Sequence, residues 1–182
     1  MDFQLKTLDP AGAAREKCDA LVLVVPEGYK PGKDPLSRLA ADALKAGDLE
    51  AKPGKMLQAY KPAGVAASRV ILVGAGDGSA RRVQAAVCAA VGSLRSSPTV
   101  KRLVLVLPQD GGEELVRAAV TGTAEAAYVY VATKSKPEGR EIARVTSVQA
   151  VNAWTKAGLM IREDLTAGSR YAATFVTPTA TN

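Results

Sequence analysis

The fold of this chain is decided by residues 69–94, RVILVGAGDGSARRVQAAVCAAVGSL. Residues 70–73 are all valine, isoleucine or leucine, as expected for a short strand that is covered on both faces. Glycines at 74, 76 and 78 then predict a tight turn. From Ser79 onward, apolar residues recur every three or four positions, which predicts a helix with one face on a sheet. The stretch therefore predicts a strand, a glycine turn and an amphipathic helix.

The same alternation of strands and helices continues on both sides of this unit. Strands are expected at residues 2–7, 20–25, 56–60, 101–108 and, more weakly, 142–149. Helices are expected from Pro35 to near Gly47, from about 113 to 130, and at 149–161. Asp34 is expected to cap the first of these helices, and Asp110 and Glu113 have the spacing of a capping box for the second.

Two stretches are expected to lie outside regular structure. Residues 9–19, DPAGAAREKCD, have the composition of a turn, and the chain beyond Arg162 is rich in Thr, Ala, Ser and Gly, which predicts a frayed tail. Strands that alternate with helices predict an α/β domain in three layers, with helices on both faces of a mostly parallel, mixed sheet.

Length and composition favour one soluble domain. A chain of 182 residues with 47% hydrophobic and 23% charged residues is typical of a globular protein with one core. The longest apolar run, residues 20–25, is far too short to cross a bilayer, and no secretory signal is expected at the N-terminus. Cys18 and Cys88 are far apart and outside any CxxC spacing, which predicts reduced thiols and a cytoplasmic protein.

Charge and histidine content narrow the classes of function. The net charge of +6 permits binding to nucleic acid, although the basic residues are spread along the chain and form only short pairs. Histidine is absent, which removes the commonest general base and a common metal ligand. Without histidine, a Ser-His-Asp or Cys-His arrangement is impossible, and no GxSxG elbow occurs. We expect that this chain alone is not a complete enzyme.

The glycine turn is the sharpest candidate for a binding site. A turn between a strand and a helix N-terminus can present backbone N–H groups to an anion, so Gly74, Gly76, Gly78 and Ser79 are candidate nucleotide-binding residues. The dinucleotide fingerprint has glycine at the position of Ser79, and Asp77 places a negative charge where a pyrophosphate would lie. The alternative is a structural turn in which Asp77 or Ser79 caps the helix.

Carboxylate clusters give a weaker signal. Asp110, Glu113 and Glu114 could be ligands for a hard cation, but helix capping explains the first two without a metal. Glu163 and Asp164 form a second acidic pair, for which solvation or pairing with Arg162 or Arg170 is a sufficient explanation. We predict neither catalytic residues nor metal ligands in this chain.

Three stretches, in this order, resemble the N-terminal domain of the leucyl aminopeptidases, the cytosol aminopeptidase family of metallo-exopeptidases. They are VILVGAGDGSARRVQAAVCAAV, AVTGTAEAAYVYVATKSK and AGLMIREDL. In that family a strand ends in VGxG before an alanine-rich helix, a later helix ends in a Tyr and Lys-Ser pattern, and an interdomain helix ends in an Arg-acidic-Leu run. The last run corresponds here to residues 162–165.

The resemblance implies a division of the chain and a larger parent protein. Residues 1–165 would be the N-terminal domain with the start of the interdomain helix, and residues 166–182 a tail where the catalytic domain would begin. The family's catalytic heptapeptide NTDAEGR is absent, because Asn152 and Asn182 are the only asparagines and neither precedes threonine. No functional residue of the family can therefore be assigned in this chain, which would be an excised domain or a truncated product.

The resemblance also implies an activity, cofactors and partners for the parent. The parent would release N-terminal residues from peptides with two divalent metals, zinc or manganese, held in the missing catalytic domain. This chain would be a non-catalytic accessory domain that assists assembly or access, with its own catalytic domain as partner in a homo-hexamer. In some bacterial members the N-terminal domains contribute to DNA binding, so a DNA-binding module is a further alternative. The fold would be macro-domain-like, and because macro domains bind ADP-ribose, a nucleotide-binding module stays open as an alternative.

Overall fold

The structure is a computed structural model that describes residues 2–7, 10–94, 97, 99–107, 113–127, 144–148 and 172–177. In chain order these residues form β1 (Asp2–Thr7), α1 (Pro10–Arg15), β2 (Ala20–Val25), α2 (Pro35–Ala46), β3 (Met56–Tyr60), β4 (Arg69–Gly74), α3 (Ala80–Leu94), β5 (Arg102–Val106), α4 (Glu113–Ala127), β6 (Arg144–Val148) and β7 (Ala172–Thr177).

The strands form one mixed sheet that is mostly parallel. Its order is β1-β7-β6-β5-β2-β4-β3, and the strands of the described residues pair in parallel except for β3, which is antiparallel to β4. Strand β2 lies between β4 and β5, with Leu21 opposite Val70 and Ala20 opposite Leu103. All six residues of β2 are buried, because helices cover the sheet on both faces here.

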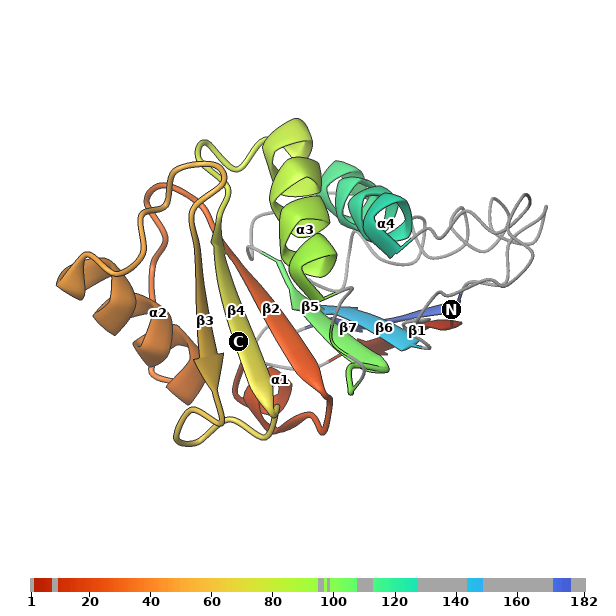
Figure 1. The fold of residues 1–182 in the computed structure, drawn as a ribbon, viewed down its shortest axis with the longest axis horizontal. Coiled ribbons are helices and arrows are strands. Elements are labelled where there is room, and N and C mark those ends of the chain that lie inside the picture. Colours follow the sequence, from red (N-terminus) through yellow and green to blue (C-terminus); the bar gives the residue numbers. More distant parts are fainter. Residues whose placement is uncertain are drawn as a thin grey trace.

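Helices form two outer layers, as Figure 1 shows. On one face, α3 and α4 cover Val22, Val24, Ile71, Val73 and Leu105. On the other face, α1 and α2 cover the alternate residues of the same strands. Successive side chains of a strand point to opposite faces, so each central strand contributes to two hydrophobic clusters. The predicted three-layer α/β fold with a mostly parallel, mixed sheet is thereby confirmed.

Helix α2 begins and ends where its sequence predicts. The Asp34 side chain accepts a hydrogen bond from the backbone N–H of Ser37 at 2.9 Å, and Pro35 occupies the first helical position. Gly47 ends the helix in the left-handed conformation, with φ of 81°, and its N–H donates to the carbonyl of Leu44.

Two expectations for irregular segments are wrong. The stretch that was expected to be a turn contains helix α1, whose Ala13 and Ala14 are buried against α2 and the sheet. Tertiary burial stabilises this short helix, which local composition did not indicate. Within the expected tail, residues 172–177 form β7, which pairs in parallel with β1. The expected helix at 149–161 lies outside the described residues.

Within the residues that the structure describes, every helix is too short or too polar to span a bilayer.

Candidate functional site at the glycine loop

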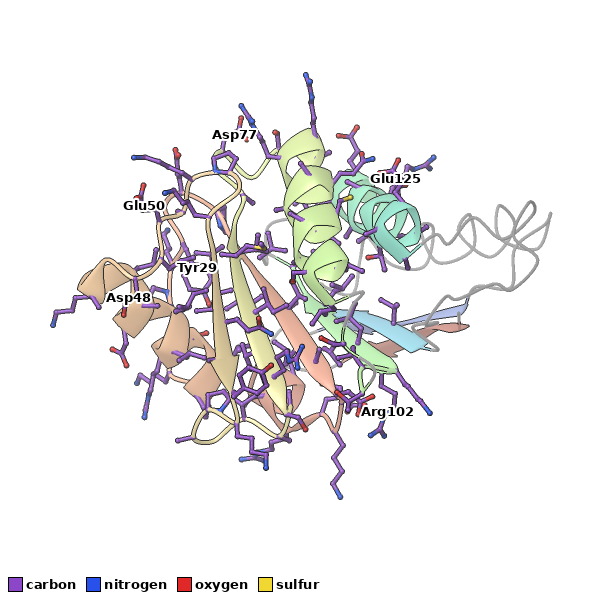
Figure 2. The ribbon with its side chains drawn as sticks, in the orientation of Figure 1. Tyr29, Asp48, Glu50, Asp77, Arg102 and Glu125 are labelled. Carbon is purple, nitrogen blue, oxygen red and sulfur yellow. The ribbon has the colours of Figure 1, made fainter. Side chains whose placement is uncertain are left out.

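The glycine loop, residues 74–79, joins β4 to α3 at the carboxyl end of the central strands. Asp77 lies in this loop and is labelled in Figure 2, at the opposite end of the molecule from Arg102. Ligand sites in α/β sheets usually lie at the carboxyl ends of the parallel strands, so this loop is a candidate ligand site. The structure brings the four predicted nucleotide-binding residues together here because they are nearly consecutive in sequence.

Five backbone N–H groups of the loop already donate hydrogen bonds within the chain. Those of Gly74, Ala75 and Gly76 donate to carbonyls of Lys55, Val25 and Ala51, at 2.9, 3.0 and 2.7 Å. The N–H of Gly78 donates to the Ala75 carbonyl at 3.1 Å, and that of Ser79 donates to the Asp77 carboxylate at 3.0 Å. A phosphate would have to displace these bonds, whereas a phosphate-binding loop directs its N–H groups at the ligand.

Close packing of neighbouring loops accounts for two of the glycines. A Cβ atom on Gly74 would lie 2.6 Å from the backbone oxygen of Glu50 and even closer to that of Lys52. Gly76 has φ of 54°, and a Cβ there would lie 2.9 Å from Cγ of Pro53. The segment around residues 50–53 therefore packs directly on the glycine loop, and only glycine fits at this contact.

Asp77 and Ser79 shape the start of α3. The Ser79 carbonyl accepts the first helical hydrogen bond, from the N–H of Val83 at 2.9 Å, which makes Ser79 the N-cap residue. The hydrogen bond from the Ser79 N–H holds the pKa of the exposed Asp77 carboxyl below its ordinary value, so this carboxylate is ionised at neutral pH. A negative charge at this point repels a phosphate. The geometry favours the structural interpretation of the loop, and nucleotide binding at Gly74, Gly76, Gly78 and Ser79 stays a prediction.

A groove of about 560 Å³ lies beside the loop, between the N-terminal halves of α3 and α4. It is lined by Ala80, Gln84, Glu114, Arg117, Ala118 and Thr121. A hydrogen bond of 3.0 Å from the Gln84 side chain to the Glu125 carboxylate links the two helices. Sequence analysis missed this groove because its two walls are about thirty residues apart along the chain. Its charged lining side chains are one arginine and one glutamate, which is too little to indicate a reaction.

The predicted acidic clusters are only partly covered by the structure. Glu114 lines the groove, whereas Asp110, Glu163 and Asp164 lie outside the described residues, as does the side chain of Glu113. In the part of the chain that the structure describes, no three or more Cys, Asp or Glu side chains are grouped so that they could hold a metal ion. The described residues therefore do not fit the two-metal site that the aminopeptidase resemblance implies for the parent.

Cys18 and Cys88 are both free thiols in the structure. Burial, together with the nearby carboxylates of Asp19 and Glu16, raises the pKa of the Cys18 thiol to about 12. A thiol with such a pKa is protonated at neutral pH and is a poor nucleophile. Cys18 is therefore a core residue, and not a candidate for covalent catalysis.

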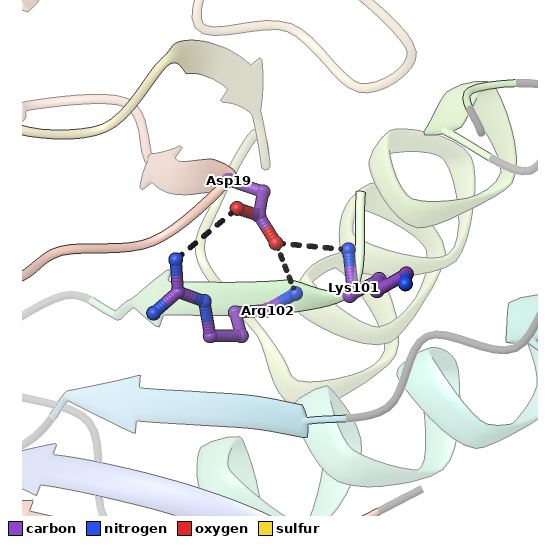
Figure 3. A network of polar contacts seen from close by, with 3 residues as sticks. All are labelled: Asp19, Lys101 and Arg102. Atoms are coloured by element: carbon purple, nitrogen blue, oxygen red, sulfur yellow. Dashed lines mark hydrogen bonds and ion pairs between the residues drawn. The ribbon is translucent and has the colours of Figure 1, made fainter. Parts of the chain in front are cut away.

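Asp19 forms the polar network drawn in Figure 3, at the end of the sheet opposite the glycine loop. Its carboxylate accepts hydrogen bonds from the backbone N–H groups of Lys101 and Arg102, at 3.0 and 2.8 Å, and lies 3.4 Å from the Arg102 guanidinium. Partial burial alone would raise the pKa of Asp19, but these bonds outweigh it and lower the pKa below its ordinary value. The network joins the starts of β2 and β5 and has a structural role.

Comparison with known proteins decides the family. The sequence profile of the "Cytosol aminopeptidase family, N-terminal domain" matches residues 32–137. The chain belongs to the cytosol aminopeptidase family. Among curated relatives, it is 53% identical over 145 residues to the "Probable cytosol aminopeptidase" of Albidiferax ferrireducens, which covers 80% of this chain and 30% of the relative. The corresponding protein of Acidovorax ebreus is 52% identical over 146 residues, with 80% and 29% covered.

The chain therefore spans about 30% of the length of the cytosol aminopeptidases that it matches. Among solved structures, the chain is similar to the bottromycin maturation enzyme BotP in complex with Mn, with a TM-score of 0.54, 22% identity, and 78% of this chain and 28% of BotP covered. It also aligns with the macrodomain of Thermus aquaticus DarG, at a TM-score of 0.42 and 11% identity, with 98% and 99% covered. The match to the family profile and to the curated relatives confirms, at the level of the family, the resemblance drawn from three sequence stretches.

Proposed function

We propose that this chain is a non-catalytic accessory domain of a leucyl aminopeptidase, which assists assembly of the enzyme or access to its active site. The observation that carries the proposal is the family match over residues 32–137, to a domain that makes up less than a third of the relatives' length. The chain has no histidine, and three reactive-looking groups of the described residues have structural explanations: Asp77 caps a turn, Cys18 is buried and protonated, and Asp19 joins two strands.

The activity belongs, in this proposal, to the parent enzyme. The parent releases N-terminal residues from peptides at a site with two divalent metals, zinc or manganese, which activate a water molecule. Those metals are held in the catalytic domain, and residues 1–165 of this chain form the N-terminal domain, with residues 166–182 at the junction. The relatives' name, cytosol aminopeptidase, and the two free thiols support a cytoplasmic location.

The partners in this proposal are the chain's own catalytic domain and other copies of the whole enzyme in a homo-hexamer. Binding to DNA would be an additional role of the parent, for which the net charge of +6 is the supporting feature. No geometric feature of the described residues favours DNA or nucleotide binding over the accessory role.

An aminopeptidase assay tests the catalytic part of the proposal. Leucine p-nitroanilide is supplied with manganese to this chain and, in parallel, to the full-length relative from Albidiferax ferrireducens. We expect turnover by the full-length relative and none by this chain. Turnover by this chain that survives repeated purification and is abolished by a chelator would refute the proposal.

Deletion of the matching domain from the full-length relative tests the accessory part. We expect the deletion variant to sediment as smaller assemblies than the intact enzyme or to show a changed KM for long peptides. An unchanged assembly with unchanged kinetics would contradict an accessory role. Calorimetry of this chain with millimolar ADP-ribose is the control for the alternative, and measurable heat of binding would favour the nucleotide interpretation.

A further inference from the structure

Strand β3 carries an exposed apolar pair at the edge of the sheet. Among the described residues, Met56 and Tyr60 are the large hydrophobic side chains that are exposed, with exposed fractions of 41% and 66%. They lie on one face of β3 together with Gln58, because side chains alternate along a strand, while Leu57 packs toward the opposite face with α2. An exposed methionine and tyrosine on one face of a short strand offer apolar contacts to another molecule.

The backbone of the same three residues faces away from the sheet. In the antiparallel pair with β4, the Gly74 N–H donates to the Lys55 carbonyl at 2.9 Å, and the Lys61 N–H donates to the Ser68 carbonyl at 3.0 Å. Alternate residues of an antiparallel strand bond to the same neighbour, so the odd-numbered residues 55–61 bond to β4. The N–H and C=O groups of Met56, Gln58 and Tyr60 therefore point to the outer edge, where a further strand would bind.

Positive charge borders the apolar pair. The exposed Lys55 and Lys61 stand at the two ends of β3, and the Arg69 guanidinium lies 4.7 Å from the centre of the Tyr60 ring. A hydrogen bond of 2.5 Å from Arg69 to the Ser97 hydroxyl orients that guanidinium. Lys55 has an acidic neighbour, Glu50, at 3.8 Å, but this exposed carboxylate is shared with Lys52, to which it lies closer, at 3.0 Å.

These charges disfavour a second copy of the chain as the occupant. If two copies paired antiparallel so that Met56 contacted Tyr60 of the other copy, Lys55 would stand directly opposite Lys61 of that copy. Like charges at directly opposed positions destabilise a strand pair. Edge lysines are a common device against such self-pairing, whereas a strand with acidic ends would be attracted by the same two lysines.

We propose that the β3 edge, defined by Lys55, Met56, Gln58, Tyr60 and Lys61, binds an extended polypeptide strand with apolar residues in its middle and acidic residues at its ends. The added strand bonds to the outward N–H and C=O groups of β3, and its apolar side chains cover Met56 and Tyr60. Its acidic ends lie near Lys55 and Lys61. The proposal does not depend on the accessory role in an aminopeptidase.

Amide hydrogen exchange of the full 182-residue chain, followed by NMR, tests the proposal with the capped peptide Glu-Val-Thr-Val-Thr-Val-Glu. We expect slower exchange of the N–H groups of Met56, Gln58 and Tyr60, and no change at Leu57 and Ala59, which already bond to β4. A peptide with lysine in place of both glutamates should bind roughly tenfold more weakly, because two ion pairs are replaced by repulsion. The Lys55→Glu and Lys61→Glu double variant should reverse that preference.

The Gln58→Pro variant should abolish binding. Its proline removes an N–H group that faces outward, so the bonds to β4 are kept and the strand can still form. If this variant does not fold, the Met56→Thr and Tyr60→Thr double variant, which keeps strand propensity, should weaken binding at least roughly tenfold by removing apolar contacts.

Three results would overturn the proposal. The first is unchanged exchange at β3 with millimolar peptide. The second is a dimer of this chain, seen by sedimentation, that Gln58→Pro dissociates. The third is a shift of the Tyr60 and Arg69 resonances by a DNA oligonucleotide but by neither peptide.

Discussion

Asp19 shows how one side chain joins segments that are far apart in the sequence. Its carboxylate accepts hydrogen bonds from the backbone N–H groups of Lys101 and Arg102, so it connects the start of β2 with the start of β5. The pair with Arg102 is half-exposed and adds little by itself. The stabilising effect comes from the backbone N–H groups that donate to the charged carboxylate of Asp19. It therefore depends on ionisation of Asp19.

We predict that Asp19→Asn lowers the free energy of unfolding at pH 7 by about 1 kcal/mol, because a charged acceptor of backbone N–H groups becomes neutral. The folded-state pKa of Asp19 lies below its ordinary value of 3.8. Its stabilisation is therefore present above pH 3.8 and is lost as the pH falls through the folded-state pKa. Urea unfolding at several pH values should show a smaller acid-induced loss of stability in the variant.

The exposed Asp42 on α2 offers a matched control for Asp19, because Asp42→Asn makes the same chemical change outside this network. A loss of stability that is equal in the two variants would contradict the role of the network.

Cys18 should be unreactive in the folded protein. With a pKa of about 12 and a buried side chain, about one thiol in ten thousand is ionised at pH 8. We predict that a disulfide reagent such as DTNB modifies the Cys88→Ser variant only after unfolding in urea. Fast modification of folded Cys88→Ser would show that the Cys18 environment is open. The Cys18→Ala variant reports Cys88 alone and serves as the control.

At the scale of elements, α3 and α4 pack through small residues. A Cβ atom on Gly122 of α4 would lie 2.5 Å from the backbone carbonyl oxygen of Gln84 in α3. The two backbones therefore approach more closely than any side chain allows. The helical pattern alone reveals apolar faces, and it does not reveal which glycine lies at a contact between two helices.

We predict that Gly122→Ala destabilises the protein by about 1–3 kcal/mol, because overpacking at the contact outweighs the higher helix propensity of alanine. Gly92→Ala in α3 is the matched control, since a Cβ at Gly92 would have nothing within 4 Å. That substitution should stabilise the protein by about 0.5–1 kcal/mol. The urea midpoints of unfolding of the Gly122→Ala and Gly92→Ala variants test both predictions. Equal changes of the midpoint in the two variants would mean that the helices are not in close contact at Gly122.

At the scale of the whole molecule, the sheet includes a strand, β7, from the stretch after Arg162 that the sequence pattern predicted to be a tail. Strand β7 pairs with β1 from Asp2 to Thr7 and touches β6 at Val145. The division at residue 165, drawn from the family resemblance, would place β7 in the tail. A domain that ends at residue 165 would be stable without residues 172–177, whereas a domain that includes β7 would depend on them.

Truncation of the chain distinguishes these two domain boundaries. A chain that ends at residue 165 loses the strand that pairs along most of β1, so we predict that it unfolds at a lower urea concentration than a control that ends at residue 177. Equal urea midpoints for the two truncated chains would show that β7 is dispensable and would favour the division at residue 165.

The alternation of apolar runs and amphipathic stretches by itself determined the layered α/β fold, the central strands and the limits of α2. These features follow from local periodicity and capping residues such as Asp34 and Gly47, which act within a few positions. Three stretches of sequence also indicated the family, because their motifs are local and occur in a fixed order.

Only the tertiary structure decided the state of the glycine loop, the helical form of residues 10–15 and the edge position of β3. Whether the loop N–H groups are free depends on Ala51 and Lys55, which pack against the loop from another part of the chain. Whether Met56 and Tyr60 are covered depends on which strands lie beside β3. Such contacts join residues that are distant in sequence, and a periodic pattern of side chains does not specify them.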